Sequence, residues 1–214
     1  MTAVVDVADW RERVTDEIPD AYNDLVDRHV LDTCIAFCVY TRIWHMRMTP
    51  MSSIANLPQY KLRVPANTKL AAVIELRYNG QKLDPVIDSD LDASTPNWET
   101  RTGTPRQYTM IDQDTVRLIG IPTEALTNAL TGSIAIKPAR NATTVGEILW
   151  EDWAESITHG AKARLFAMKN EDWFDAAAAR RHEDEYKVAA DKAKGVGMNR
   201  HTTRSRRRVF AKYF

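Results

Sequence analysis

The first long periodic segment of the chain runs from Pro19 to about Met48 and predicts a helix. Pro19 suits the first helical turn, and the acids that follow it complement the positive end of the helix dipole. An apolar stripe at helical spacing widens over nearly every face, at Val26, Val30, Leu31, Cys34, Ile35, Phe37, Cys38 and Trp44. We therefore expect a central helix that is contacted on several sides and stops near Pro50.

From Tyr60 the apolar period changes from helical to alternating, which predicts half-buried strands. The strands are predicted at 60–64, 72–78, 81–83, 107–111, 115–119 and 133–137. Asn79-Gly80 is the favoured type I′ hairpin turn, and Asp112-Gln113-Asp114 forms a second turn between strands. A small antiparallel sheet or sandwich follows from this pattern.

Helical periodicity returns at Glu147. A nearly unbroken row at i,i+4 spacing predicts one long helix, with Leu149, Trp153, Ile157, Ala161, Leu165 and Met168. Gly160 beside this row allows a neighbouring helix to approach closely. A third helix with a charged surface is predicted over 172–194, ending before Gly195 and Gly197.

Together these segments predict an α+β protein, a discontinuous antiparallel helical bundle with an inserted small antiparallel β-sheet or sandwich domain and an extended C-terminal arm. The expected parts are the helical domain at 1–58 and 144–198, the β domain at 59–143, and the arm at 199–214. Residues 84–105 are expected to form a long loop, and such loops are usually functional or mobile. Trp98 in this loop is a candidate anchor for a tail or neighbour interface, with packing in a satellite cluster as the alternative.

Composition excludes several broad classes. The 214 residues are 44% hydrophobic and 27% charged, and 29 Lys plus Arg balance 29 Asp plus Glu. This balance argues against a globally basic nucleic-acid binder. No segment has the ~20 consecutive apolar residues of a membrane-spanning helix, and the first 13 residues do not resemble a secretory signal. We therefore expect no membrane anchor and a reducing compartment.

No motif predicts catalysis, a cofactor or a metal site. His182-Glu183 begins like a helical zinc-protease motif, but Tyr186 stands where the second His is required. The Gly195-x-Gly197 pair follows a predicted helix, whereas a dinucleotide loop follows a strand. We therefore expect a protein that is not an enzyme.

The two cysteines and the helical histidines have simpler interpretations. Cys34 and Cys38 share one helix face inside an apolar run, which favours buried thiols over a metal pair. His29, His45 and His159 are expected to lie singly in helices, as packed or surface residues rather than general bases.

Charge is distributed unevenly along the chain. Asp191 is the last acid, and the eight Lys and Arg residues over 192–214 give that segment a charge of +8 and the remainder −8. This asymmetry indicates an interaction arm. Arginines together with Phe210, Tyr213 and Phe214 form a composition common to protein-interface hot spots and nucleic-acid contacts. A disordered solubilising tail is the alternative, although exposed aromatic rings gain nothing until something buries them.

Several segments, in this order, carry a family resemblance. They are Ala-Phe-Cys-Val-Tyr-Thr-Arg-Ile-Trp at 36–44, a strand pair with Tyr-Lys-Leu-Arg-Val-Pro and Arg-Tyr-Asn-Gly-Gln-Lys-Leu, Gly-Thr-Pro-Arg-Gln-Tyr at 103–108, residues 153–168, and Asp-Trp at 172–173. Their order resembles the head-to-tail adaptor proteins of tailed bacteriophages, which include the tail tubular ring proteins of short-tailed phages. The resemblance covers most of residues 18–195 and consists of packing and turn patterns.

The resemblance implies a virion protein of the head-tail interface that is assembled in the host bacterial cytoplasm. It implies a homo-oligomeric ring, typically twelve-fold, with portal protein above, tail nozzle or tail fibre proteins below, and double-stranded DNA passing through the centre. In such adaptors the C-terminal segment docks on the portal. Transferred to this sequence, the portal-docking residues are Arg200, Arg204, Arg206, Arg207, Arg208, Phe210, Lys212, Tyr213 and Phe214. The competing hypothesis is a nucleic-acid-binding regulatory protein whose basic arm grips phosphates.

Overall fold

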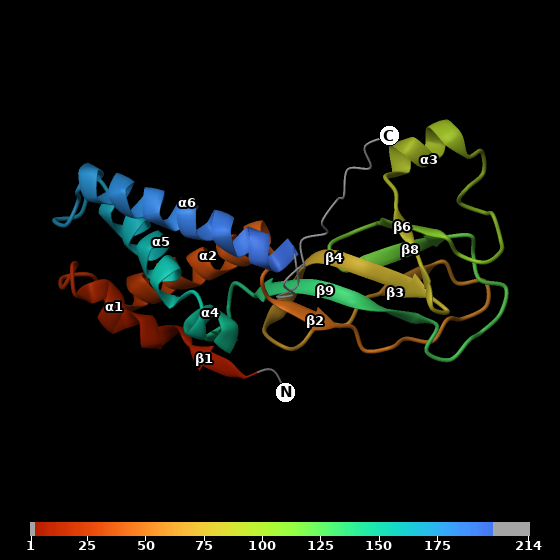
Figure 1. Ribbon diagram of the computed structural model, residues 1–214, viewed down its shortest axis with the longest axis horizontal. Helices are drawn as coiled ribbons and strands as arrows, with labels where there is room; N and C mark the ends of the chain where they lie inside the picture. The colour runs from red at the N-terminus through yellow and green to blue at the C-terminus, as the bar shows by residue number, and fades with distance from the viewer. Residues whose placement is uncertain (1–2, 199–214) are drawn as a thin grey trace, which may run out of the picture.

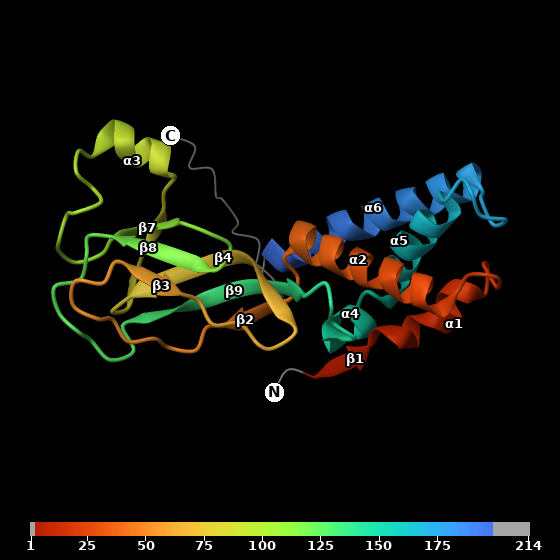
Figure 2. The ribbon, with the colours of Figure 1, turned by 180° about the vertical axis from the view of Figure 1, so that it is seen from behind.

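The computed structural model describes residues 3–198 as two lobes placed end to end, one helical and one built of strands (Figures 1 and 2). The helical lobe combines the two ends of the described chain, and the β lobe is formed by the segment between them. The predicted α+β class, with strands inserted in a discontinuous helical bundle, is confirmed.

The helical lobe is built on three long helices and a set of short elements. The long helices are α2 (Asn23–Thr41), α5 (Ala154–Phe166) and α6 (Ala176–Met198). The short elements are β1 (Val4–Asp6), η1 (Val7–Trp10), α1 (Arg11–Thr15), β10 (Thr144–Gly146) and α4 (Glu147–Glu151). β1 pairs antiparallel with β10, so the beginning of the chain is tied to the strand that leads back into the bundle.

The β lobe contains two four-stranded sheets. The first has the order β2 (His45–Arg47), β9 (Leu130–Pro138), β4 (Thr68–Tyr78) and β5 (Gln81–Lys82). The second has the order β3 (Gln59–Lys61), β8 (Thr115–Ile119), β7 (Gln107–Met110) and β6 (Asp84–Pro85). All pairs are antiparallel except β6 with β7. One continuous core cluster joins the inner faces of the sheets to the helices.

Two predictions for the β lobe are confirmed in detail, and one is refined. Asn79 and Gly80 both have positive φ, as a type I′ turn requires, and they join β4 to β5. The Asp112 carboxylate accepts hydrogen bonds from the amides of Asp114 and Thr115, which forms the second predicted turn. The predicted loop at 84–105 contains a short helix, α3 (Asp88–Ser94), because Leu91 is buried in a satellite cluster.

The helix predicted to continue to about Met48 ends at Thr41. Arg42 adopts a left-handed conformation with φ of 53°, and its amide donates to the Cys38 carbonyl at 2.9 Å. The chain then becomes strand β2, which pairs with β9. Trp44, which the sequence pattern placed on the helix, instead packs so closely on Gly146 that a Cβ there would lie 2.6 Å from the indole.

The single helix predicted from Glu147 is divided into α4 and α5. Trp153 has φ of −136° and ψ of 15°, which breaks the helical path between them. The apolar i,i+4 row continues across the break, because Leu149, Trp153 and Ile157 are all buried. Periodicity in the sequence therefore does not reveal the break.

The last helix begins later and ends later than predicted. Asp175 precedes it and accepts hydrogen bonds from the amides of Ala177 and Ala178. The helix then passes through Gly195 and Gly197 to Met198 instead of stopping before them. Gly197 packs on the end of α2, where a Cβ would lie 2.3 Å from the Thr41 carbonyl oxygen, so it is a packing glycine rather than a helix stop.

Gly160 of α5 has the role that the sequence predicted, because a Cβ at this position would lie 2.5 Å from Thr33 and 2.8 Å from Tyr186. We expect Gly160→Ala to overpack this three-helix contact at a cost of about 1–3 kcal/mol, partly offset by about 1 kcal/mol of helix propensity. The urea midpoint of unfolding, followed by circular dichroism, should therefore fall.

The matched control is Gly195→Ala in α6, where a Cβ would meet nothing within 4 Å. This variant should unfold at an equal or higher urea concentration, since only the gain in helix propensity remains. A rise in the midpoint of Gly160→Ala would contradict the close packing of the three helices.

Candidate functional site

The predicted docking residues lie outside the described residues, but the structure shows where their segment departs. The residues in question are Arg200, Arg204, Arg206, Arg207, Arg208, Phe210, Lys212, Tyr213 and Phe214, all within 199–214. α6 runs from the tip of the helical lobe back to the junction between the lobes and ends there at Met198 (Figure 1). The arm is therefore attached at the middle of the elongated molecule.

A hollow of about 610 Å³ opens at this junction, and we call it the junction groove. It lies between the last turn of α2, the last turn of α6 and the middle of β4. Its apolar walls are Val39, Tyr40, Val73, Ile74 and Met198, and its cationic groups are Arg42 and Lys194. Val39 is 47% exposed, Tyr40 46% and Met198 74%. A concave surface with exposed apolar walls favours an apolar ligand.

Two backbone features create the groove. The left-handed Arg42 turns the chain from α2 into the β lobe, which leaves the last helical turn open at its side. Gly197 lets the end of α6 lie directly against the Thr41 carbonyl, so α6 closes one flank of the hollow. β4 forms the opposite wall and has irregular register with β9 between Leu70 and Ala72 and between Val73 and Glu75.

Polar contacts fix the rim of the groove. The Tyr40 hydroxyl donates to an Asp191 carboxylate oxygen, which joins α2 to α6. This hydrogen bond to a carboxylate raises the pKa of Tyr40, because ionisation would remove the donor. The Lys194 ammonium lies 4.2 Å from the centre of the Tyr40 ring in a cation–π contact.

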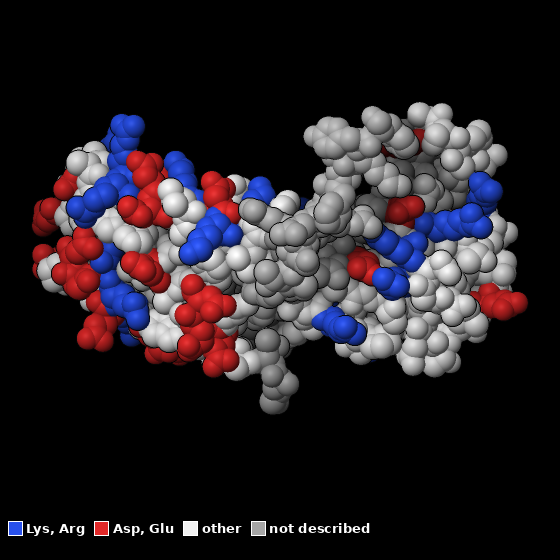
Figure 3. Space-filling view, in the orientation of Figure 1, with Lys and Arg blue, Asp and Glu red and all other residues white. Residues whose placement is uncertain are grey.

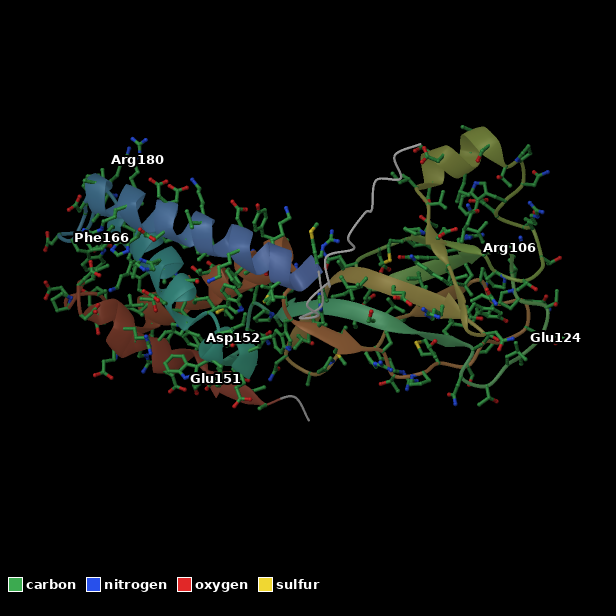
Figure 4. All side chains as sticks on the ribbon, viewed as in Figure 1. Arg106, Glu124, Glu151, Asp152, Phe166 and Arg180 are labelled. Atoms are coloured by element: carbon green, nitrogen blue, oxygen red, sulfur yellow. The ribbon has the colours of Figure 1, made fainter. Side chains whose placement is uncertain are left out.

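The two lobes differ in charge. Residues 3–44 and 144–198 contain 20 acids and 12 Lys or Arg, a net charge of −8, whereas residues 45–143 contain 9 acids and 11 Lys or Arg. Acidic side chains are prominent over the helical lobe in Figure 3, among basic ones, whereas the β lobe shows fewer acidic side chains and several Lys or Arg on the same face. Glu151 and Asp152 lie at the lower edge of the helical lobe (Figure 4). The acid excess deduced for the body of the chain is therefore concentrated in one lobe.

Of the two roles predicted for Trp98, interface anchor or packing in a satellite cluster, the structure shows the packing. Trp98 is 7% exposed and packs with Leu91 and Ile119 in the satellite cluster. Its indole N–H donates to Asp92 at 2.8 Å, and the Arg117 guanidinium lies 5.2 Å from the ring centre. The ring thus fixes the 84–105 segment to β8, and little of it is accessible for an interface.

A polar cluster around the buried side chains of Lys162 and His182, at the far end of the helical lobe, was not predicted. Lys162 of α5 is 4% exposed, and its ammonium contacts Asp16 at 2.6 Å and Glu17 at 2.7 Å. The hydrogen bond from Lys162 is the main cause of a lowered pKa at Glu17. The cluster therefore fastens the turn after α1 to α5.

The same cluster contains a histidine pair. The Nδ1 atoms of His159 and His182 are 2.8 Å apart, so one ring donates and the other accepts, and both cannot be cationic in this geometry. His182 is 3% exposed, stacks on Phe166, and has Nε2 at 3.2 Å from both Glu17 and Arg181. Figure 4 shows Phe166 between α5 and α6 and Arg180 directed away from them. Burial is the main cause of a lowered pKa at His182.

The prediction of single helical histidines is therefore wrong for two positions. His159 is paired with His182, and His45 lies in strand β2 rather than in a helix. The paired residues come from α5, α6 and the turn after α1, and no spacing in the sequence links them. Lys162, which directly follows Ala161 of the apolar row, is the signal that could have indicated this cluster.

Cys34 and Cys38 are buried free thiols, as predicted, and burial raises the pKa of each. Within residues 3–198, no group of three or more His, Cys, Asp or Glu side chains is arranged to hold a metal ion. None of the helices in this part of the chain is both long enough and apolar enough to cross a membrane.

Comparison with known proteins adds no relative. No protein-family model matches the sequence, and no curated protein shows significant similarity to it.

We expect His182 to make stability depend on pH. A histidine whose pKa is lowered by folding binds fewer protons in the native state than in the unfolded state, so stability is lost as pH falls below about 6.5. The melting temperature should therefore be lower at pH 5.5 than at pH 7.5, and His182→Asn should reduce this difference. Burial lowers the pKa of His29 in the same direction, so some dependence should remain.

Arg180→Gln is the matched control, because Arg180 lies on the same helix, points to solvent and should leave the pH dependence unchanged. An equal pH dependence in His182→Asn and the parent protein would show that folding does not change the protonation of His182. The lowered pKa of Glu17 does not contribute to the difference between pH 5.5 and pH 7.5, because it affects stability only below about pH 4.5.

Proposed function

We propose that this protein is a structural adaptor of a phage virion, which forms a ring that joins the portal vertex to the tail and contributes to the DNA ejection channel. In this role the arm at 199–214 docks on the portal, its arginines pair with acidic portal side chains, and Phe210, Tyr213 and Phe214 fill portal pockets. Tail nozzle or tail fibre proteins bind below, and the protein acts without catalysis.

The order of elements in the fold carries this proposal. The segments that carry the resemblance are an N-terminal helix, a strand pair and closing helices, and the fold has its elements in this order, with the basic aromatic arm next along the sequence. α6 ends at Met198, so the arm directly follows the last helix of the bundle along the chain. In the proposed assembly the two lobes form the ring, and the arm attaches the ring to the portal.

The charge of the helical lobe supports a position close to DNA. A lobe with net charge −8 repels phosphates, and a repulsive channel wall lets a duplex slide without binding. The arm has a net charge of +6 over 199–214 and would bind an acidic partner. In the proposed ring the acidic lobe lies toward the channel, and the basic arm leaves it to reach the portal.

Removal of residues 199–214 should abolish attachment to the portal while leaving the bundle folded, because the core cluster of the described residues is formed between Val5 and Val196. The test is light scattering after size exclusion of the full chain and the truncated chain, each mixed with the portal protein of the same phage. The full chain should form a stoichiometric ring complex, and the truncated chain should elute separately with an unchanged melting temperature.

Two full-length variants separate the contributions within the arm. Arg204, Arg206, Arg207 and Arg208 are changed to Gln in one, and Phe210, Tyr213 and Phe214 to Ala in the other. Unchanged attachment of the truncated chain would refute the docking role. Salt-sensitive DNA binding through the arginines, with no portal complex, would support the nucleic-acid-binding regulator instead.

A further inference from the structure

The junction groove begins where the described chain ends, because Gly197 and Met198 are part of its wall. Its other apolar walls belong to α2 and β4, and Val39, Tyr40 and Met198 leave much of their surface exposed. Its volume of about 610 Å³ lies within the range of about 300–1,000 Å³ over which pockets enclose a ligand. An apolar hollow of this size can therefore bind an apolar segment that lies close to it along the chain.

The nearest apolar group along the chain is the end of the arm. Val209, Phe210, Tyr213 and Phe214 are separated from Met198 by ten residues, 199–208. Ten residues span at most about 35 Å when fully extended, so the chain is long enough to return to a groove that starts at the attachment point of the arm. A short tether of this kind gives an effective concentration of about millimolar, far above that of a second molecule in dilute solution.

Charge favours the same arrangement. The arm has a net charge of +6 and is attached to a helical lobe of net charge −8. The groove itself contains the cations Arg42 and Lys194, so it suits the apolar end of the arm better than its arginine run. Arg204–Arg208 would therefore remain over the acidic helical surface while the apolar end enters the hollow.

We propose that, in the free protein, the apolar end of the arm, Val209–Phe214, occupies the junction groove of its own chain. The arm then has two alternative binding sites, its own groove before assembly and a partner afterwards. Intramolecular binding hides the aromatic side chains and lowers the apparent affinity of the free protein for any partner that needs them. The inference concerns the unassembled protein and does not depend on the portal being that partner.

Photocrosslinking of the full chain tests the proposal. Phe210 is replaced by p-benzoylphenylalanine, the protein is irradiated alone, and the crosslinked peptides are mapped by mass spectrometry. We expect crosslinks to the segments at 39–42, 73–74 and 194–198 that form the groove. Irradiation of a mixture of ¹⁵N-labelled and unlabelled protein should give crosslinked peptides of one isotope only, since the contact lies within one chain.

A matched pair of substitutions shows whether the groove is responsible. Val39→Glu places a charge in the groove and should reduce the crosslink yield about tenfold. Val188→Glu makes the same change at a 70% exposed position on α6 outside the groove and should leave the yield unchanged. Ile74→Glu on β4 tests the opposite wall, with circular dichroism to establish that each variant is folded.

Each other outcome would overturn the proposal. Crosslinks outside the three segments, or no crosslinks, would show that the arm does not occupy the groove. Crosslinks that join the two isotopes would show that a second copy supplies the arm. Because the experiment contains no portal, such failure leaves the adaptor proposal untouched, whereas loss of portal binding on truncation would leave the groove proposal untouched.

Discussion

The structure depends on covering α2 on nearly every side. Cys34, Phe37 and Cys38 are completely buried, although they lie on a helix whose neighbours come from distant parts of the chain. α5 and α6 cover one side, η1 lies against another, and β9 contacts the end that leads into the sheets. The hydrophobic surface of one helix therefore holds both lobes together, since neither lobe can bury it alone.

This packing also determines where the surfaces for partners lie. α6 must run along α2 to complete the bundle, and Gly197 lets it come against Thr41 at the junction. The junction groove and the departure point of the arm are thus consequences of how the core is closed. The polar cluster of Lys162, Glu17 and His182 has a complementary role at the far tip, where its ion pairs and hydrogen bonds add to the burial of Ile18 in holding the turn after α1.

Much of the fold could be predicted because its signals are local. The Asn79-Gly80 turn, the alternating strands and the small residue at Gly160 act through their immediate neighbours or through a simple period. The end of α2 could not be predicted, because Trp44 is apolar in either conformation and only Gly146 shows where it packs. The groove and the histidine pair also arise from segments far apart in sequence, so no motif marks them. The arm was predicted from its charge and its aromatic residues, and neither feature indicates a groove at the end of α6.

The discontinuous bundle has a consequence for synthesis. Chains emerge from the ribosome beginning at the N-terminus, and Ala154, where α5 begins, follows Thr41 by 113 residues. The β lobe is made from one continuous segment, so it can form before α5 and α6 have been synthesised to cover α2. During that interval the thiols of Cys34 and Cys38 and the aromatic ring of Phe37 are open to oxidation and to nonspecific association. The nascent chain is therefore most vulnerable in α2, and a chaperone that binds apolar helical segments would protect it until α5 and α6 have been made.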